Sequence, residues 1–170
     1  KNIQTIDGVR KNILTQNMIN KPNTIYEIRY DFDLNGEEIT VPENCVLKFN
    51  GGSFNNGTVI GTSTKIQANS YRIFQDINIK GSFISDLNAM WIGALPNNES
   101  CDNSQFIIKW WQEYIKCGFS KIYFPHNTYY FHSTIQLTPN ALNATIDGNN
   151  SIFISKVQDG ALIYNYTEDS

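Results

Sequence analysis

The acidic residues near the start of the chain are spaced like ligands of a calcium-binding loop. Asp31, Asp33 and Asn35 alternate ahead of Gly36, which copies the first half of an EF-hand loop. The second half departs from that pattern, because Pro42 stands where the loop needs a bidentate glutamate. We therefore expect a strand that ends in an Asn-Gly turn, and no bound metal or other cofactor.

Histidines and carboxylates could also support metal binding, proton transfer or glycosidic cleavage. His126 and His132 flank two tyrosines, but no third ligand is evident, so we expect surface positions beside a turn. Cleavage of a glycosidic bond needs two carboxylates, or a carboxylate with a cation. The candidates are Asp76, Asp86, Asp102, Asp147 and Asp159. No spacing pairs them, so we expect no catalytic site within these residues and assign Asp102 to a helix N-cap.

Several apolar residues could instead contact a partner. Trp110 and Trp111 could form a sugar-stacking platform, but core packing accounts for Trp110 more simply. Trp111 lies about 100° away on the helix, which suits an interface with a neighbouring subunit. The first residues provide further candidates for an interface: Ile13, Leu14 and Met18. Together with Ile19 they fit one side of a short helix ended by Pro22, and an extended arm lying on a neighbour fits equally well.

Short strands separated by Asn and Gly turns must position these side chains. The expected strands cover residues 24–32, 39–41, 45–49, 57–60, 64–68 and 77–79, and then 121–125, 129–131, 134–137, 144–148, 151–154 and 161–164. Asn and Gly tolerate positive φ and so make sharp corners. Strands this short become stable when they stack on similar neighbours, which is the construction of a solenoid.

One helix interrupts the strands. Asp102-Asn103-Ser104 is a capping signal, apolar residues recur at helical spacing through Ile115, and Cys117-Gly118 ends the pattern. We expect a single helix, from Asp102 to Cys117, that caps a mainly β fold.

The composition restricts the class of protein. A formal net charge of −3 provides no basic field for a phosphate backbone, which argues against nucleic-acid binding. No stretch approaches the roughly 20 apolar residues of a membrane-spanning helix. The three cysteines show no paired C-x-x-C spacing, and we expect reduced thiols.

The stretch from Trp91 to about Tyr164 resembles the N-terminal part of pectate-lyase-superfamily β-helices. The β-helices of many phage tailspikes and tail fibres begin with the same arrangement. That family reads W-x-G-A, then D-x-x-x-I on a helix, then V-Y-F-P-x-G-x-Y. The matching residues here are Trp91, Gly93 and Ala94, then Asp102, then Phe124, Pro125 and Tyr129. The resemblance implies a right-handed parallel β-helix. The family's G-D-G-x-x-D-D segment is replaced by residues 96–102, so the resemblance implies the fold and no inherited catalytic residue.

The upstream block, residues 23–52, is similar to a module found ahead of such β-helices in proteins of gut bacteria and their phages. We therefore expect an attachment arm or short helix at residues 1–23, a short-strand β module at 24–90, and the helix with the first rungs at 91–170.

The resemblance implies a structural and adhesive protein of a phage virion, the N-terminal part of a homotrimeric tail fibre or tailspike. Residues before about Asn23 would dock on other tail proteins, and a part beyond Ser170 would bind host surface polysaccharide. Two alternatives remain open: the first rungs of a secreted bacterial polysaccharide lyase or glycoside hydrolase, and a non-catalytic protein of the bacterial surface.

Overall fold

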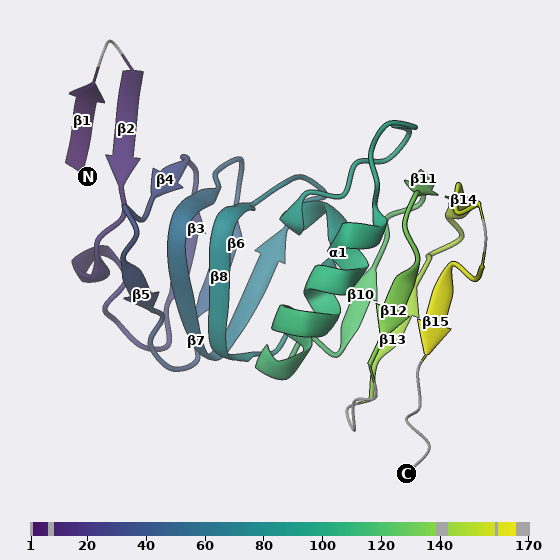
Figure 1. Ribbon diagram of the computed structural model, residues 1–170. Helices are drawn as coiled ribbons and strands as arrows, with labels where there is room; N and C mark the ends of the chain where they lie inside the picture. Colours follow the sequence, from purple (N-terminus) through teal and green to yellow (C-terminus); the bar gives the residue numbers. More distant parts are fainter. Residues whose placement is uncertain (1, 7–8, 139–142, 159, 166–170) are drawn as a thin grey trace. The chain divides into compact units, whose positions relative to one another are not determined.

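The computed structural model describes residues 2–6, 9–138, 143–158 and 160–165. Within these ranges the chain is mainly β, with parallel sheets and one α-helix. It divides into two compact units, Lys1–Ser85 and Asp86–Ser170 (Figure 1).

The first unit is one sheet of eight strands and a short 3-10 turn, η1. Its elements are β1 (Asn2–Ile6), β2 (Val9–Ile13), η1 (Gln16–Met18), β3 (Ile25–Ile28), β4 (Phe32–Asp33), β5 (Glu38–Thr40), β6 (Val46–Phe49), β7 (Phe54–Ala68) and β8 (Phe74–Phe83). Apart from the antiparallel β1–β2 hairpin, every strand pairing is parallel. From β2 to β7, each strand pairs with a segment about 20 residues further along the chain, for example Ile25 with Val46 and Val46 with Lys65.

This repeat stacks equivalent side chains on one another and so builds the core. Phe32, Phe54 and Phe74 are register partners on three successive passes of the chain. All three are at most 7% exposed, and the Phe32 and Phe54 rings meet edge to face with centroids 6.4 Å apart. On the outer side of the sheet, Lys48 lies 3.6 Å from Glu27 across the β3–β6 ladder. The buried inward residues therefore contribute more to the free energy of unfolding than this exposed ion pair does.

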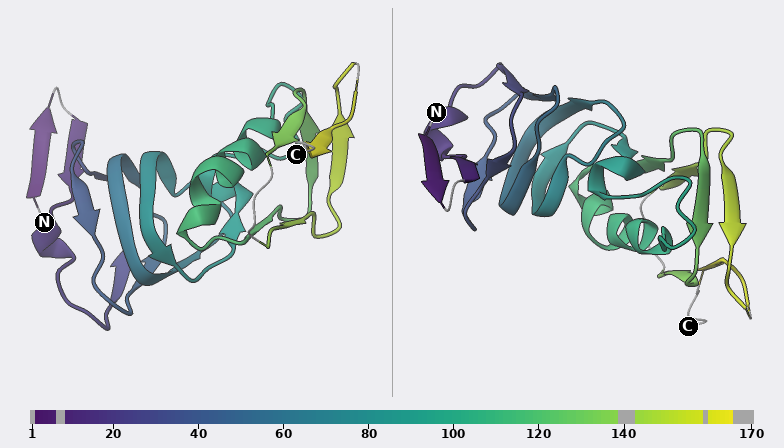
Figure 2. Two further views of the ribbon diagram at one scale, coloured as in Figure 1. Left: turned by 60° about the horizontal axis from the view of Figure 1, so that its bottom comes forward. Right: turned by 90° about the horizontal axis from the view of Figure 1, so that it is seen from above.

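Two glycines allow β7 and β8 to turn together. Gly61 and Gly81 are register partners, and a Cβ on Gly81 would lie 2.1 Å from the Gly61 carbonyl oxygen. Gly81 also has a φ of +79°. The register shifts between Gly61 and Thr64, as in a β-bulge, and β7 then pairs with β6. The bulge turns the strand without ending it, so the two strands expected at 57–60 and 64–68 are one; β7 and β8 run side by side in Figures 1 and 2.

The prediction that Asn and Gly form the corners is confirmed. Seven of the described non-glycine residues with positive φ are asparagines: Asn23, Asn35, Asn44, Asn56, Asn97, Asn149 and Asn150. Asparagine tolerates this left-handed region because its short side chain can hydrogen-bond to nearby backbone.

The segment after β2 closes one edge of the first unit, and of the two alternatives left open for it, the short helix over Ile13 to Ile19 does not form. Ile13 ends a strand and η1 is a single turn, because the segment bonds to the sheet edge instead of to itself. The Leu14 N–H donates to the Asp33 carbonyl at 2.9 Å. Leu14 and Ile19 are 3% and 1% exposed and cover the core of their own unit.

Gln16 takes the place of a strand at this edge. Its carboxamide accepts from the Thr40 N–H at 2.8 Å and donates to the Thr40 carbonyl at 2.8 Å, and it also donates to the Ile19 carbonyl at 2.7 Å. We expect Gln16→Ala to lower the free energy of unfolding by about 1 kcal/mol, since water can replace part of this bonding at an exposed site. Urea unfolding measures the loss. The neighbouring exposed Asn17→Ala is the control, and equal losses in both variants would contradict the role of the carboxamide.

The second unit combines a helical segment with three small parallel sheets. Its elements are β9 (Leu87–Asn88), the 3-10 helix η2 (Ala89–Ile92), α1 (Ser104–Lys109), the π-helical η3 (Trp110–Tyr114), the 3-10 turn η4 (Ile115–Cys117), β10 (Lys121–Tyr123), β11 (Thr128–Phe131), β12 (Ile135–Leu137), β13 (Thr145–Asp147), β14 (Ile152–Ser155) and β15 (Ile163–Asn165). The helical segment runs without a break from Ser104 to Cys117 and ends at Gly118 with a φ of 101°, which confirms the expected helix. α1 packs against β12 (Figure 1).

The strands of the second unit again pair with segments further along the chain. β10 pairs with β13, β11 with β14 and β12 with β15, all in parallel and about 24 to 28 residues apart. The inward residues of the earlier strands are fully buried, as with Ile122 and Ile135 at 0%. In the later strands Ile163, the register partner of Ile135, is 44% exposed. The later strands therefore present an open apolar edge.

Candidate functional site

The residues Trp91, Gly93 and Ala94 form the end of the helix η2. Gly93 adopts a left-handed φ of 118° as the C-cap, and the Ala94 N–H donates to the Ala89 carbonyl at 3.0 Å. Trp91 and Ala94 are 4% and 1% exposed. The W-x-G-A motif thus ends a helix and packs into the core, and it presents no side chain to a ligand.

Asp102 joins the start of α1 to the turn between β11 and β12. Its Oδ1 accepts from the backbone N–H groups of Ser104 at 3.0 Å and His132 at 2.9 Å, and its Oδ2 accepts from the Ser133 hydroxyl at 2.7 Å. The Ser104 hydroxyl donates to the Ser133 carbonyl at 2.7 Å. We name this set of four residues, Asp102, Ser104, His132 and Ser133, the Asp102 cluster.

The hydrogen bonds of the Asp102 cluster show that the assignment of Asp102 as the N-cap is wrong and that its carboxylate has a wider role. The N-cap position belongs to Asn103, which is fully buried and whose carboxamide accepts from the Leu95 N–H at 3.0 Å. Burial by itself raises the pKa of Asp102, but the hydrogen bonds from His132, Ser133 and Ser104 outweigh it and lower that pKa to about 2. A carboxylate held by three hydrogen-bond donors of its own unit is a structural anion.

Phe124, Pro125 and Tyr129 form part of an aromatic core. The rings of Phe124 and Tyr129 meet edge to face at 4.9 Å, and Phe153 packs against both, at 5.1 and 6.1 Å. The Tyr129 hydroxyl donates to the Pro125 carbonyl at 2.9 Å. Burial raises the pKa of Tyr129 to about 12, so its phenol stays protonated. These motif residues stabilise the fold.

Trp110 is fully buried, as expected, and its indole N–H donates to the Phe119 carbonyl at 2.6 Å. Trp111 is half-buried, and its indole N–H reaches the Thr138 hydroxyl of the same chain at 3.4 Å. Its place in an interface stays a prediction.

The structure separates the two histidines. His126 Nδ1 lies 2.8 Å from the Asn150 carbonyl, and His132 Nε2 lies 2.8 Å from the Glu99 carbonyl. Asp33, from the calcium-like motif, accepts from the Asn35 N–H at 2.6 Å in a turn. Among the described residues no three His, Cys, Asp or Glu side chains gather as metal ligands.

The outer side of the β9–β10–β13 sheet carries a mixed cluster that sequence reasoning missed. Lys121 Nζ lies 2.7 Å from Asp86 Oδ2 and 3.9 Å from Asp147 Oδ2. Hydrogen bonding to Asp86 raises the pKa of Lys121. Tyr123 follows on the same strand, and burial raises its pKa. Asp86 and Asp147 come together only through the strand register, which no spacing in the sequence reveals.

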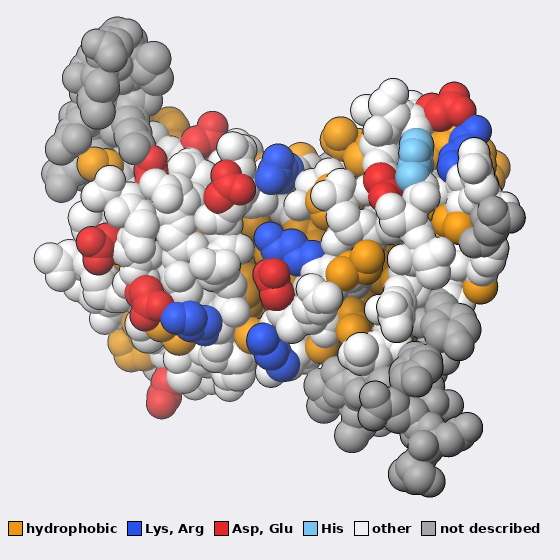
Figure 3. Space-filling view, viewed as in Figure 1, with side chains coloured by type: hydrophobic (Ala, Val, Ile, Leu, Met, Phe, Trp, Pro, Cys, Tyr) orange, Lys and Arg blue, Asp and Glu red, His pale blue; other side chains and the backbone are white. Residues whose placement is uncertain are grey.

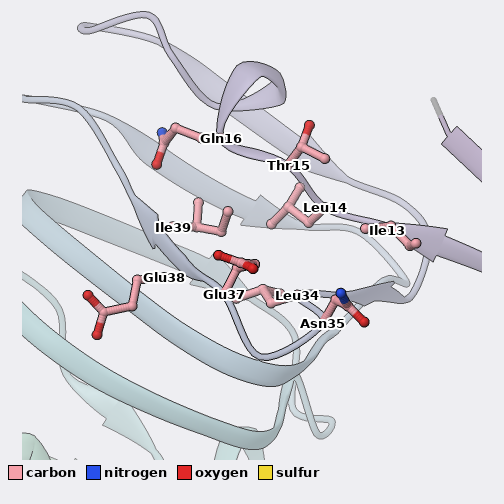
Figure 4. A pocket seen from close by; sticks show the side chains of 9 residues that line it. All are labelled: Ile13, Leu14, Thr15, Gln16, Leu34, Asn35, Glu37, Glu38 and Ile39. Carbon is pink, nitrogen blue, oxygen red and sulfur yellow. The ribbon is translucent and has the colours of Figure 1, made fainter.

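The predicted contact residues Ile13 and Leu14 line an open pocket of about 320 Å³ in the first unit (Figure 4). Leu34 and Ile39 complete its apolar part, and the polar lining residues are Thr15, Gln16, Asn35, Glu37 and Glu38. Met18 is half-buried outside the pocket. Since the Leu14 side chain is 3% exposed, it acts as part of the floor and offers little surface of its own to a partner.

On the face seen in Figure 3, acidic and basic side chains are interspersed. No helix in the described residues is long and apolar enough to cross a membrane.

Comparison with protein-family models, curated proteins and solved structures finds no match to this chain.

Proposed function

We propose that the chain is the N-terminal part of a right-handed parallel β-helix of the pectate-lyase type. The support is the repeated parallel pairing, about 20 residues apart in the first unit and about 24 to 28 in the second. Stacked phenylalanines such as Phe32, Phe54 and Phe74 are the inward ladders that successive coils of such a fold need.

The function we assign to this β-helix is that of a homotrimeric phage tail fibre or tailspike, located in the virion tail. The observation that carries the proposal is the succession of parallel coils, because such stacking builds a stiff rod from short strands. The N-terminal segment attaches the rod to other tail proteins. The coils present a receptor-binding part to host surface polysaccharide.

The apolar edge of the second unit supports the proposal that the receptor-binding part follows β13, β14 and β15. Ile163 is 44% exposed, whereas its register partner Ile135 is fully buried. Phe153 is half-buried, whereas its partner Tyr129 is fully buried. A further coil stacked on β13, β14 and β15 would cover these side chains. The polysaccharide-binding coils lie on that side in this proposal.

Sedimentation equilibrium of the purified chain tests the assembly. We expect three times the chain mass over a wide concentration range, together with resistance to protease. Electron microscopy of phage particles labelled with antibodies against the chain tests the location, and we expect label on the tail. A monomer, or a label confined to bacterial cells, would contradict the proposal.

A second candidate, a bacterial polysaccharide lyase or glycoside hydrolase, is favoured by one observation. Asp86 and Asp147 both lie within 4 Å of the Lys121 ammonium, so two carboxylates and a cation share one outward surface. Incubation of the chain with bacterial capsular polysaccharide separates the two candidates. New reducing ends or unsaturated uronates would favour the enzyme, and an unchanged polymer favours adhesion.

A further inference from the structure

The pocket lined by Ile13 and Leu14 combines an apolar floor with one carboxylate. Leu14, Leu34 and Ile39 are at most 3% exposed and form the floor. The Glu37 carboxylate lies between Leu34 and Ile39, whereas the Glu38 side chain points away from them (Figure 4). Ile13 also lines the pocket and is only half-buried, so a ligand that fills the pocket meets its aliphatic carbon together with a negative charge.

Glu37 is the carboxylate left open to a ligand. Glu38 is already paired with the Lys80 ammonium. Among the described residues, Glu37 makes no ion pair and no side-chain hydrogen bond. The Gln16 carboxamide is occupied by the backbone of Thr40 and Ile19, so it holds the wall in place and is not available to a ligand.

The chemistry that fits is a cation on an aliphatic stem. Lysine and arginine side chains bury their methylene groups along apolar surface while the charged end reaches a carboxylate or water. A volume of about 320 Å³ is at the lower end of ligand pockets and suits one side chain. Since the pocket is open, the cation keeps part of its hydration, which limits the desolvation cost.

We infer that this pocket is a socket for a single lysine or arginine side chain of a partner protein. The pocket begins at Ile13, the last residue of β2, so it lies where the N-terminal hairpin joins its unit. That the partner is a virion protein rests on the proposed function, whereas the chemistry of the socket rests on the pocket alone.

A titration with a small probe tests the socket on the full chain. The probe is Nα-acetyl-lysine methylamide, and its matched control is Nα-acetyl-norleucine methylamide, which keeps the four-carbon stem without the ammonium group. NMR shifts of the Leu34 and Ile39 methyl groups report binding. We expect a Kd of about 1–10 mM for the lysine probe. Norleucine should bind about two- to fivefold more weakly, as for an exposed ion pair.

Two variants assign the effect to one carboxylate. Glu37→Gln should reduce lysine binding to the level of norleucine, and Glu37→Lys should abolish it. Glu38→Gln, a matched change one residue away, should leave it unaltered. Equal binding of the two probes, an unchanged affinity in E37Q, or no shift of the pocket methyl groups would each overturn the socket. A monomer in sedimentation with intact lysine binding would overturn only the proposed virion function.

Discussion

Replacing Phe54 with alanine is expected to lower the free energy of unfolding by about 3–5 kcal/mol, a large part of the stability of an ordinary domain. Phe54 is fully buried. It is the middle member of the Phe32–Phe54–Phe74 ladder, and its ring also meets that of Phe49 at 5.0 Å. Truncation therefore removes contacts on both sides and leaves a cavity that neighbouring strands cannot close without losing register.

Urea unfolding followed by far-UV circular dichroism measures this loss. Ile84→Ala is the control, because Ile84 is an apolar residue of the same unit that is 63% exposed. Its expected change is within about 0.5 kcal/mol. A loss below about 1 kcal/mol for Phe54→Ala would mean that the ladder does not hold the first unit together.

Much of the fold could be predicted from local sequence. Asn and Gly mark the corners because few other residues adopt positive φ, and Gly118 ends the helix for the same reason. The strands between the corners follow from their apolar content. What could not be predicted is pairing, because a parallel partner lies about 20 residues away and no local pattern encodes the register.

The N-terminal segment shows how tertiary contacts override a local pattern. Ile13, Leu14, Met18 and Ile19 have helical spacing, yet the sheet edge offers Leu14 and Gln16 backbone partners that a helix would deny them. A contact of Ile13, Leu14 and Met18 with a partner stays a prediction, and Leu14 and Ile19 are buried in their own unit. The socket at Glu37 could not be predicted from the sequence, because only the fold brings Glu37 together with Ile13 and Leu14.

The second unit repeats this lesson at Asp102. The capping signal predicted the start of the helix correctly, but His132 and Ser133, which bind the same carboxylate, come about 30 residues later. Sequence spacing cannot connect them. The motif residues Trp91, Phe124 and Tyr129 likewise prove to be core residues, which is why a motif of this kind predicts a fold better than a reaction.

The Asp102 cluster makes the stability of the second unit depend on pH, so that stability falls in acid. The folded-state pKa of Asp102 is lowered from 3.8 to about 2. The stabilisation is therefore complete above the unfolded pKa and disappears as the pH falls through about 2. With an allowance for solvent screening at this half-buried site, we expect it to contribute about 1–2 kcal/mol at pH 7.

Asp102→Asn and Asp102→Ala separate the charge from the hydrogen bonds. The asparagine side chain can still accept hydrogen bonds from Ser104 and His132. Like protonated Asp102, it carries no charge. The gap in unfolding free energy between wild type and D102N should therefore be about 1–2 kcal/mol at pH 7 and should close between about pH 4 and pH 2. D102A leaves the Ser104, His132 and Ser133 donors without their acceptor, so its larger gap should persist in acid. Trp91, Trp110 and Trp111 all lie in this unit, so tryptophan fluorescence in urea reports its unfolding directly. A D102N gap that stays constant from pH 7 to pH 2 would show that the lowered pKa does not stabilise the fold.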